Sequence, residues 1–241
     1  AVASTLNRRR ALEGADYVII TIMVGGLKHY YSDVAIPAKY GVYQAVSDTI
    51  GPGGVMRIIR TAPVLEGLVK DLKAVAPNAW VLNYANPMAM NCWTMLDCGH
   101  ERTVGLCHSI QGAINEIGHW LEIPPEQIRY TAGGINHVNF YLTLEHDGED
   151  IYPKLAACAE RVIDQRPAER VRFELLKYLG YWPAEGPHHQ SEYSPYFRKD
   201  AQRVDHYGVE TFWGYNNDSR HMTRRAEEID KQIAGELPIS Y

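Results

Sequence analysis

The amino-acid sequence predicts an α/β fold, with a parallel sheet in its first half and a mixed α+β unit in its second. Up to residue 125, apolar β-branched runs alternate with helical patterns, which is typical of a doubly wound parallel sheet. After Pro125, apolar and polar residues alternate around a turn at Asp147-Gly148, which indicates extended strands. We therefore expect a domain boundary between residues 1–125 and 126–241.

Each element of the first half follows from a local pattern. Strands are predicted at residues 15–22, 79–87 and 102–107, the first of them buried on both faces. Helices are predicted at residues 56–76, 88–96 and 110–123, with prolines after the first and the last of them. One side of the first helix carries the apolar residues Ile58, Ile59, Leu65, Leu68, Val69 and Leu72.

The second half gives weaker signals. Residues 166–180 form a helical pattern with a C-cap near Gly180, and a polar, aromatic loop at 183–197 leads to a charged terminal helix. Residues before 15 are expected to form a short helical lead-in. The chain lacks an initiator Met and stops just after a helical pattern, so both ends look like cuts through a longer protein.

Composition restricts the possible partners. The 241 residues carry a formal net charge of -5, which argues against nucleic acid or an anionic membrane, since both usually require a basic surface. We find no apolar run of about eighteen residues and no signal peptide, so we expect no membrane partner. No CxxC pair is present, and we interpret the cysteines as reduced thiols of a cytoplasmic protein: Cys92, Cys98, Cys107 and Cys158.

Candidate site residues follow the predicted strands, because ligands bind at the carboxyl ends of parallel strands. Those positions are Gly25-Gly26, Asn83 to Pro87, and Cys107-His108. Cys107 and His137 both lie where loops leave strands, and a thiolate with an imidazole suits a borderline divalent metal. Two alternatives stay open: Cys107 is a nucleophile paired with His108 or His137, or it is a small buried hydrophobe. Neighbours on a strand face opposite sides, which disfavours the Cys107–His108 pair.

Two further segments carry groups suited to catalysis. Asp48 precedes a glycine-rich turn that opens a helix, where free N–H groups favour anions, although the turn is neither GxGxxG nor a P-loop. Asp48 is either a helix cap or a carboxylate directed at a site. The segment 188–197 contains Tyr193, and a tyrosine near a cation can have its pKa lowered enough to act as a base. The alternative is an exposed polar loop with an aromatic anchor.

Five segments resemble glycoside hydrolase family 4, and most closely its α-galactosidase branch, in their order and spacing. They are "DTIGPGGVMRIIRTAP", "VLNYANPMAMNCW", "VGLCHSIQG", "GGINHVNFYL" and "HHQSEYSPYF". The resemblance implies a glycosidase that uses NAD and a divalent metal, usually Mn²⁺. In the implied mechanism, NAD takes hydride from C3 of the sugar and a base removes the acidified C2 proton. The glycosidic oxygen then leaves by elimination, water adds, and the hydride returns.

The resemblance also implies roles for individual residues. Cys107 and His137 match the metal ligands, and Tyr193 matches the base that takes the C2 proton. Asp48 matches an acidic residue that raises the basicity of this tyrosine, and Asn86 matches a substrate contact.

Two assignments are less direct. Asn83, together with Gly25 and Gly26, is assigned to the cofactor. His108 stands where phospho-glucosidase members have Asp. An imidazolium can protonate a leaving group, and this substitution argues against a 6-phosphorylated substrate.

The GxGxxG loop and the acidic ribose ligand of a dinucleotide fold do not occur in this sequence. We therefore expect residues 1–125 to form an incomplete Rossmann-like sheet, the C-terminal portion of an NAD-binding domain. Residues 126–241 are expected to form the front portion of an α+β catalytic and metal-binding domain.

The function implied by the resemblance is hydrolysis of small α-galactosides by a homo-oligomer, either a dimer or a tetramer. The alternatives are an α-glucosidase or α-galacturonidase of the same family, and an inactive truncated remnant. A lactate/malate-type dehydrogenase is a further alternative, because that group also has a strand that ends in Asn-Pro but uses a His–Asp pair without a metal.

Overall fold

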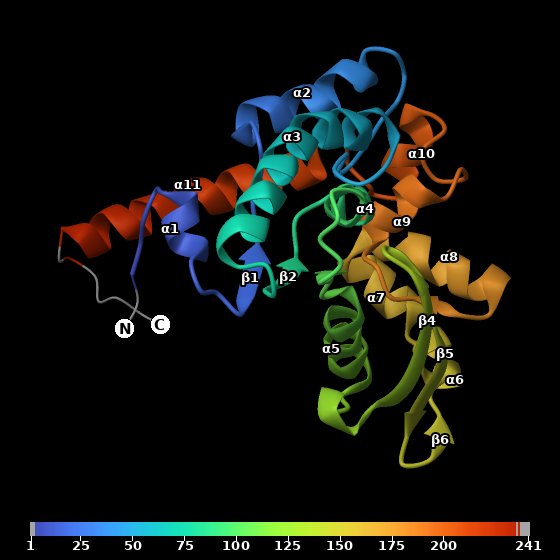
Figure 1. The fold of residues 1–241 in the computed structure, drawn as a ribbon. Coiled ribbons are helices and arrows are strands. Elements are labelled where there is room, and N and C mark those ends of the chain that lie inside the picture. The colour runs from blue at the N-terminus through green and yellow to red at the C-terminus, as the bar shows by residue number, and fades with distance from the viewer. Residues whose placement is uncertain (1–2, 235, 237–241) are drawn as a thin grey trace.

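The structure is a computed structural model that describes residues 3–234 and 236. A parallel sheet has the order β1-β2-β3, with strands β1 (Tyr17–Ile20), β2 (Trp80–Asn83) and β3 (Thr103–Gly105). The helices of this half are α1 (Arg8–Leu12), α2 (Gly26–Ala38), α3 (Gly51–Val75), α4 (Met88–Asp97) and α5 (Ser109–Leu121). The predicted α/β alternation is confirmed (Figure 1). The predicted cuts at the two ends concern residues 1–2 and 237–241, which lie outside the described residues.

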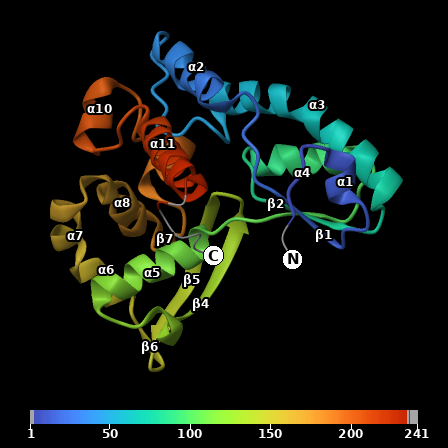
Figure 2. The same cartoon turned by 90° about the vertical axis from the view of Figure 1, so that its left-hand side faces the viewer.

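Only one face of the parallel sheet is covered in the described part of the chain. Figure 2 shows α1, α3 and α4 on one side of β1 and β2. Side chains from these elements form a common core that includes Ile20, Leu72 and Val81. The prediction that β1 is buried on both faces is wrong, because Tyr17 and Ile19 point to the other face and are 68% and 62% exposed.

The helical predictions in this half are mostly right in type and less accurate in detail. α3 ends at Val75, just before Pro77, but it begins at Gly51, earlier than its apolar pattern suggests. The predicted apolar side of α3 includes Ile59, but this residue is 59% exposed. Its angular position on the helix lies outside the buried stripe. The sequence patterns predict no helix at α2, whose sparse buried residues are interrupted by polar ones.

The second unit is built on an antiparallel sheet. Its strands are β4 (Arg129–Ile135), β5 (Val138–His146), β6 (Glu149–Asp150) and β7 (Trp182–Pro183), with β5 paired to each of the others. Its helical segments are η1 (Pro125–Gln127), α6 (Tyr152–Ala157), α7 (Ala159–Gln165), η2 (Pro167–Glu169) and α8 (Arg170–Leu179). Gly180 caps α8 with φ 78°, as predicted. The expected extended strands after Pro125 are confirmed.

Helix α5 connects the two units. It begins directly after the loop that follows β3, and its buried face joins the core of the antiparallel unit (Figures 1 and 2). In that core Trp120 packs edge-on against Trp182, with ring centroids 5.7 Å apart. Helix α5 therefore leads from the carboxyl end of β3 directly into the core of the second unit.

The last part of the chain returns to the first unit. It contains α9 (Pro187–Tyr193), α10 (Ala201–His206) and α11 (Trp213–Ile233). The predicted charged terminal helix is confirmed as α11, but the predicted loop at 183–197 is wrong in part. Gly186 and Pro187 start α9 there, which is held by buried polar side chains and has no apolar periodicity. No helix among the described residues has the length and apolarity to span a membrane.

Backbone hydrogen bonds fix this return. Gly214 N–H donates to Ala45 C=O at 2.9 Å, and Phe212 N–H donates to Gln44 C=O at 3.3 Å. A Cβ at position 214 would lie 2.3 Å from the Tyr30 hydroxyl, so the close approach of these segments requires glycine.

Candidate active site

A cavity of about 710 Å³ lies between the carboxyl ends of the parallel strands and the second unit. This is the edge at which parallel sheets bind ligands. The cavity is lined by residues from many separate parts of the chain, which include Asp48, Asn86, Cys107, His108, His137, Glu185, His189 and Asn217. The predicted site residues Asp48, Asn86, Cys107, His108 and His137 therefore share one cavity.

Three donor atoms of different chemistry meet in this cavity. Cys107 comes from the loop after β3, His137 from the turn between β4 and β5, and Glu185 from the segment after β7. Their ligand atoms lie within 4.8 Å of one another. Glu185 Oε2 is 3.5 Å from His137 Nε2 and 4.0 Å from Cys107 Sγ. Sulfur, nitrogen and oxygen donors at this spacing suit a divalent metal ion.

The turn that carries His137 is tight. Ile135 pairs with Val138 across it, and His137 has φ 59°, in the left-handed region. A non-glycine residue there is uncommon, although His, Asn and Asp tolerate the region best. This geometry directs the buried imidazole toward both Glu185 and Tyr193.

The hydrogen-bond network assigns the two nitrogens of His137. Thr49 donates its single hydroxyl hydrogen to Asp48 at 2.8 Å. Its oxygen can therefore only accept a hydrogen bond from His137 Nδ1–H, 3.3 Å away. Burial and the neighbouring His189 lower the pKa of His137, which favours the neutral ring. A neutral ring with its hydrogen on Nδ1 leaves the Nε2 lone pair facing Glu185, as a metal ligand requires.

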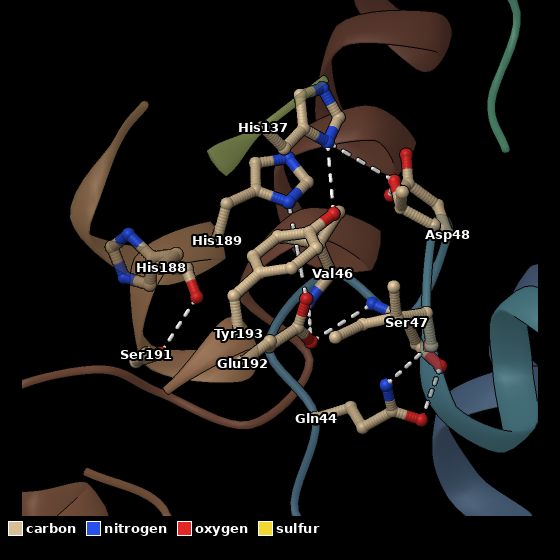
Figure 3. Close-up of polar contacts among 12 residues, drawn as sticks. Gln44, Val46, Ser47, Asp48, His137, His188, His189, Ser191, Glu192 and Tyr193 are labelled. Carbon is tan, nitrogen blue, oxygen red and sulfur yellow. Dashed lines mark hydrogen bonds and ion pairs between the residues drawn. The ribbon is translucent and has the colours of Figure 1, made fainter. Parts of the chain in front are cut away.

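Tyr193 adjoins the same imidazole. Its hydroxyl oxygen lies 3.0 Å from His137 Nδ1 (Figure 3). Burial raises the pKa of Tyr193, the hydrogen bond with Thr49 opposes this rise, and the charge of Asp48 adds to it. The sequence analysis expects a lowered pKa for Tyr193 only when a cation lies beside it. The raised pKa reflects the surrounding protein residues without such a cation.

Asp48 is buried and well supplied with donors. It accepts hydrogen bonds from Asn86 Nδ2 at 2.7 Å and from Thr49, and its Oδ2 lies 3.5 Å from Arg57 Nη1. Burial opposes ionisation, but His189, Arg57 and these hydrogen bonds outweigh it and lower the pKa of Asp48. Asp48 is therefore a carboxylate directed at the site, and the alternative of a helix cap is wrong because Ile50 is the N-cap of α3.

The remaining predicted residues differ in position. His108 is exposed, lines the cavity and precedes α5. Gly25, Gly26 and Asn83 do not line it. Asn83 is fully buried and donates to Ala85 C=O at 3.0 Å, and Gly25 forms the left-handed N-cap of α2. Their assignment to the cofactor stays a prediction.

Sequence reasoning missed Glu185 and Thr49. Glu185 follows a strand too short to show alternation, and no spacing rule connects it to Cys107. Its position after a strand is the one signal that was present.

Glu185 gives a direct test of the three-donor cluster. Replacing Glu185 with glutamine is expected to weaken Mn²⁺ binding by at least about 10-fold, because it removes the anionic donor. Titration calorimetry measures the affinity, with the exposed Glu160→Gln as the control. Unchanged affinity in Glu185→Gln would remove this residue from the metal site.

The fold and the site together define a class: a Rossmann-type sheet joined to a second unit with a candidate metal site at the junction. The chain belongs to family 4 of the glycosyl hydrolases. The model of the family 4 glycosyl hydrolases matches residues 1–123, and that of their C-terminal domain matches residues 132–238.

Relatives with assigned activities support the family membership. The chain is 40% identical to an α-galactosidase of Bacillus subtilis over 200 residues, 83% of this chain and 46% of the relative. It is 30% identical to an α-galacturonidase of Thermoanaerobacterium saccharolyticum over 246 residues, 91% of this chain and 53% of the relative. The chain thus spans about half the length of the curated relatives it matches.

Solved structures share the fold. A Bacillus subtilis protein for which a glucosidase activity has been suggested superimposes with a TM-score of 0.85 at 25% identity, covering 99% of this chain and 59% of that one. A 6-phospho-α-glucosidase from gut microorganisms, solved with NAD and Mn²⁺, superimposes with a TM-score of 0.76 at 18% identity, covering 97% and 55%.

Proposed function

We propose that the protein hydrolyses small α-galactosides with the help of NAD and a divalent metal, Mn²⁺. One observation carries this proposal: the ligand atoms of Cys107, His137 and Glu185 lie within 4.8 Å of one another. The Tyr193 hydroxyl is hydrogen-bonded to Nδ1 of the same His137 imidazole. A lactate/malate-type dehydrogenase works with a His–Asp pair and no metal, so its reaction does not require a cluster of three metal-ligating side chains.

The protein residues have distinct tasks in this reaction. Cys107, His137 and Glu185 would hold the metal, which would supply a Lewis acid for the sugar oxygens, and the nicotinamide would supply a reversible hydride acceptor. Tyr193 takes the C2 proton. His137 Nδ1–H donates to the phenol oxygen and holds it in place. Asp48 holds Asn86, which is positioned to contact a sugar hydroxyl.

The cofactor is expected along the carboxyl ends of β1, β2 and β3. Gly26 begins α2 after β1, and a Cβ there would have no neighbour within 4 Å, so the backbone is open to a ligand. An uncapped helix N-terminus favours anionic groups such as phosphates.

The charge of the cavity favours a neutral sugar. Asp48, Glu116, Glu185, Glu210 and Asp218 are among its lining carboxyl groups. Arg166 is the only Arg or Lys among the described lining residues, and its Nη1 is paired with Glu116 at 3.0 Å. Apart from the proposed metal, a uronate or a phosphorylated sugar would find no unpaired Arg or Lys among these lining residues, which supports the α-galactoside over the α-galacturonide.

His108 is proposed as the acid that protonates the leaving group. Mutating His108→Asn is expected to reduce turnover of substrates with poor leaving groups by about 100-fold or more, and that of activated aryl glycosides far less. Steady-state kinetics on melibiose and on p-nitrophenyl α-galactoside measure the two effects. Equal losses for both substrates would count against this role.

Hydrolysis of p-nitrophenyl α-galactoside with NAD, Mn²⁺ and a reductant tests the whole proposal. It should be performed with this chain and with the complete gene product that contains it. Activity that requires both NAD and Mn²⁺ is the expected result. Activity that persists after removal of either one would overturn the mechanism, and preference for an α-galacturonide would overturn the sugar assignment. The inactive-remnant alternative predicts no turnover by either preparation.

We also propose that the protein works in the cytoplasm as a dimer or a tetramer. The four cysteines are free, which supports a reducing compartment. Light scattering coupled to gel filtration tests the assembly, and a monomer at micromolar concentration would contradict it.

A further inference from the structure

The segment 44–49, which we call the 44–49 loop, carries Asp48 and Thr49 into the active site. Besides the hydrogen bond between Thr49 and Tyr193, the Glu192 side chain joins this loop to α9 (Figure 3). Glu192 Oε1 accepts hydrogen bonds from Val46 N–H at 2.9 Å and from Ser47 N–H at 3.0 Å. The Glu192 side chain is only 3% exposed. If its carboxylate were removed, water could not reach these two backbone N–H groups to accept their hydrogen bonds.

The 44–49 loop needs such an anchor because its backbone is unusual. Ser47 has φ 59°, in the left-handed region that a serine seldom adopts. On its other side, Ser47 Oγ lies 2.9 Å from Asp33 C=O and 3.0 Å from Gln44 Oε1. Glu192 closes the loop from the opposite side, and the chain enters the site immediately afterwards.

Glu192 also stands next to two groups of the site. It precedes Tyr193 in α9, and its Oε2 lies 3.9 Å from His189 Nδ1, a buried atom without a hydrogen bond. The His189 ring lies 4.5 Å from that of His137. One carboxyl group on the helix that carries Tyr193 therefore contacts the loop that carries Asp48 and Thr49.

We propose that Glu192 is a positioning residue: it fastens the 44–49 loop to α9, so that Thr49 and Asp48 stay in register with Tyr193. This inference rests on the proposed function for the role of Tyr193, but the anchoring itself does not. The essential property is the acceptor oxygen. An amide oxygen can accept the same two hydrogen bonds, so glutamine should replace Glu192 and alanine should not.

Amide hydrogen exchange, followed residue by residue by NMR, tests the anchoring without any turnover. In Glu192→Ala, exchange at Val46 and Ser47 should accelerate by about 10- to 100-fold, the order expected for the loss of a buried partner. Glu192→Gln should stay near the parent rate, and so should the exposed Glu160→Ala control. If Glu192→Ala does not fold, Glu192→Asp, whose acceptor is withdrawn by one methylene group, takes its place. Loss of amide protection at Val46 and Ser47 in Glu192→Gln would overturn the anchoring. Retained protection in Glu192→Ala, or in Glu192→Asp where that variant replaces it, would overturn it as well.

Kinetics in the complete gene product test the link to Tyr193. Glu192→Ala should lower kcat by about 10-fold or more with KM within about 3-fold, while the deuterium isotope effect at C2 of the sugar rises. Mn²⁺ affinity should not change, because Glu192 does not touch the metal donors. A lower kcat with an unchanged isotope effect, or no change in kcat, would overturn the positioning role. An inactive parent enzyme would instead contradict the proposed function and leave the exchange test intact.

Discussion

Replacing Tyr193 with phenylalanine is expected to lower kcat for an α-galactoside by about 100- to 10,000-fold, the usual contribution of a positioned general base. The change removes the phenol oxygen that lies 3.0 Å from His137 Nδ1 and keeps the ring. Exchange of the sugar C2 hydrogen with solvent deuterium should stop with it. Steady-state kinetics and NMR of the substrate measure these two effects.

The control for this experiment is Tyr196→Phe. Neither tyrosine is among the residues that line the cavity, but Tyr196 is 64% exposed and packs against Phe197 rather than His137. It should keep the parent kcat, and both variants should bind Mn²⁺ with parent affinity. Normal turnover by Tyr193→Phe would remove this residue from the catalytic step.

The second large effect is expected at His137. Replacing His137 with asparagine should weaken Mn²⁺ binding by about 100-fold or more and reduce hydrolysis to the same extent, since it removes a proposed metal ligand whose Nδ1 also contacts Tyr193. Asparagine tolerates the left-handed φ of 59°, so the turn itself should persist. Calorimetric titration with Mn²⁺ measures the loss.

His119→Asn provides the comparison, because His119 is an exposed histidine on α5 away from the cavity. Its metal affinity should equal that of the parent protein. If His137→Asn binds Mn²⁺ with parent affinity, the metal is held by other residues. The His137 tautomer with its hydrogen on Nδ1 then has no role in metal binding.

The fold was predictable where local patterns report burial. Val81, Leu65 and Leu72 lie in periodic runs and are buried as expected. The exposure of Tyr17 and Ile19 was not predictable, because an apolar strand does not reveal whether its second face is covered. Helix α9 was missed because polar contacts hold it, and these contacts join residues far apart in the sequence.

The site was predictable in so far as strand ends and family motifs mark it. Cys107 and His137 follow strands, and the structure brings their side chains to one point. Glu185 was not predictable, since it joins them only through the pairing of β7 with β5. Thr49 was also hidden: its role depends on the direction of one hydroxyl hydrogen, which no sequence pattern encodes.

The origin of the three donors has a thermodynamic consequence. Cys107 belongs to the parallel-sheet unit, whereas His137 and Glu185 belong to the antiparallel unit. An ion held by all three would act as a cross-link between the two units, in parallel with α5. At a concentration 100 times its dissociation constant, such an ion stabilises the native state by about 2.7 kcal/mol. The metal would then be a structural tie between the units as well as a reagent, and its loss would loosen their alignment.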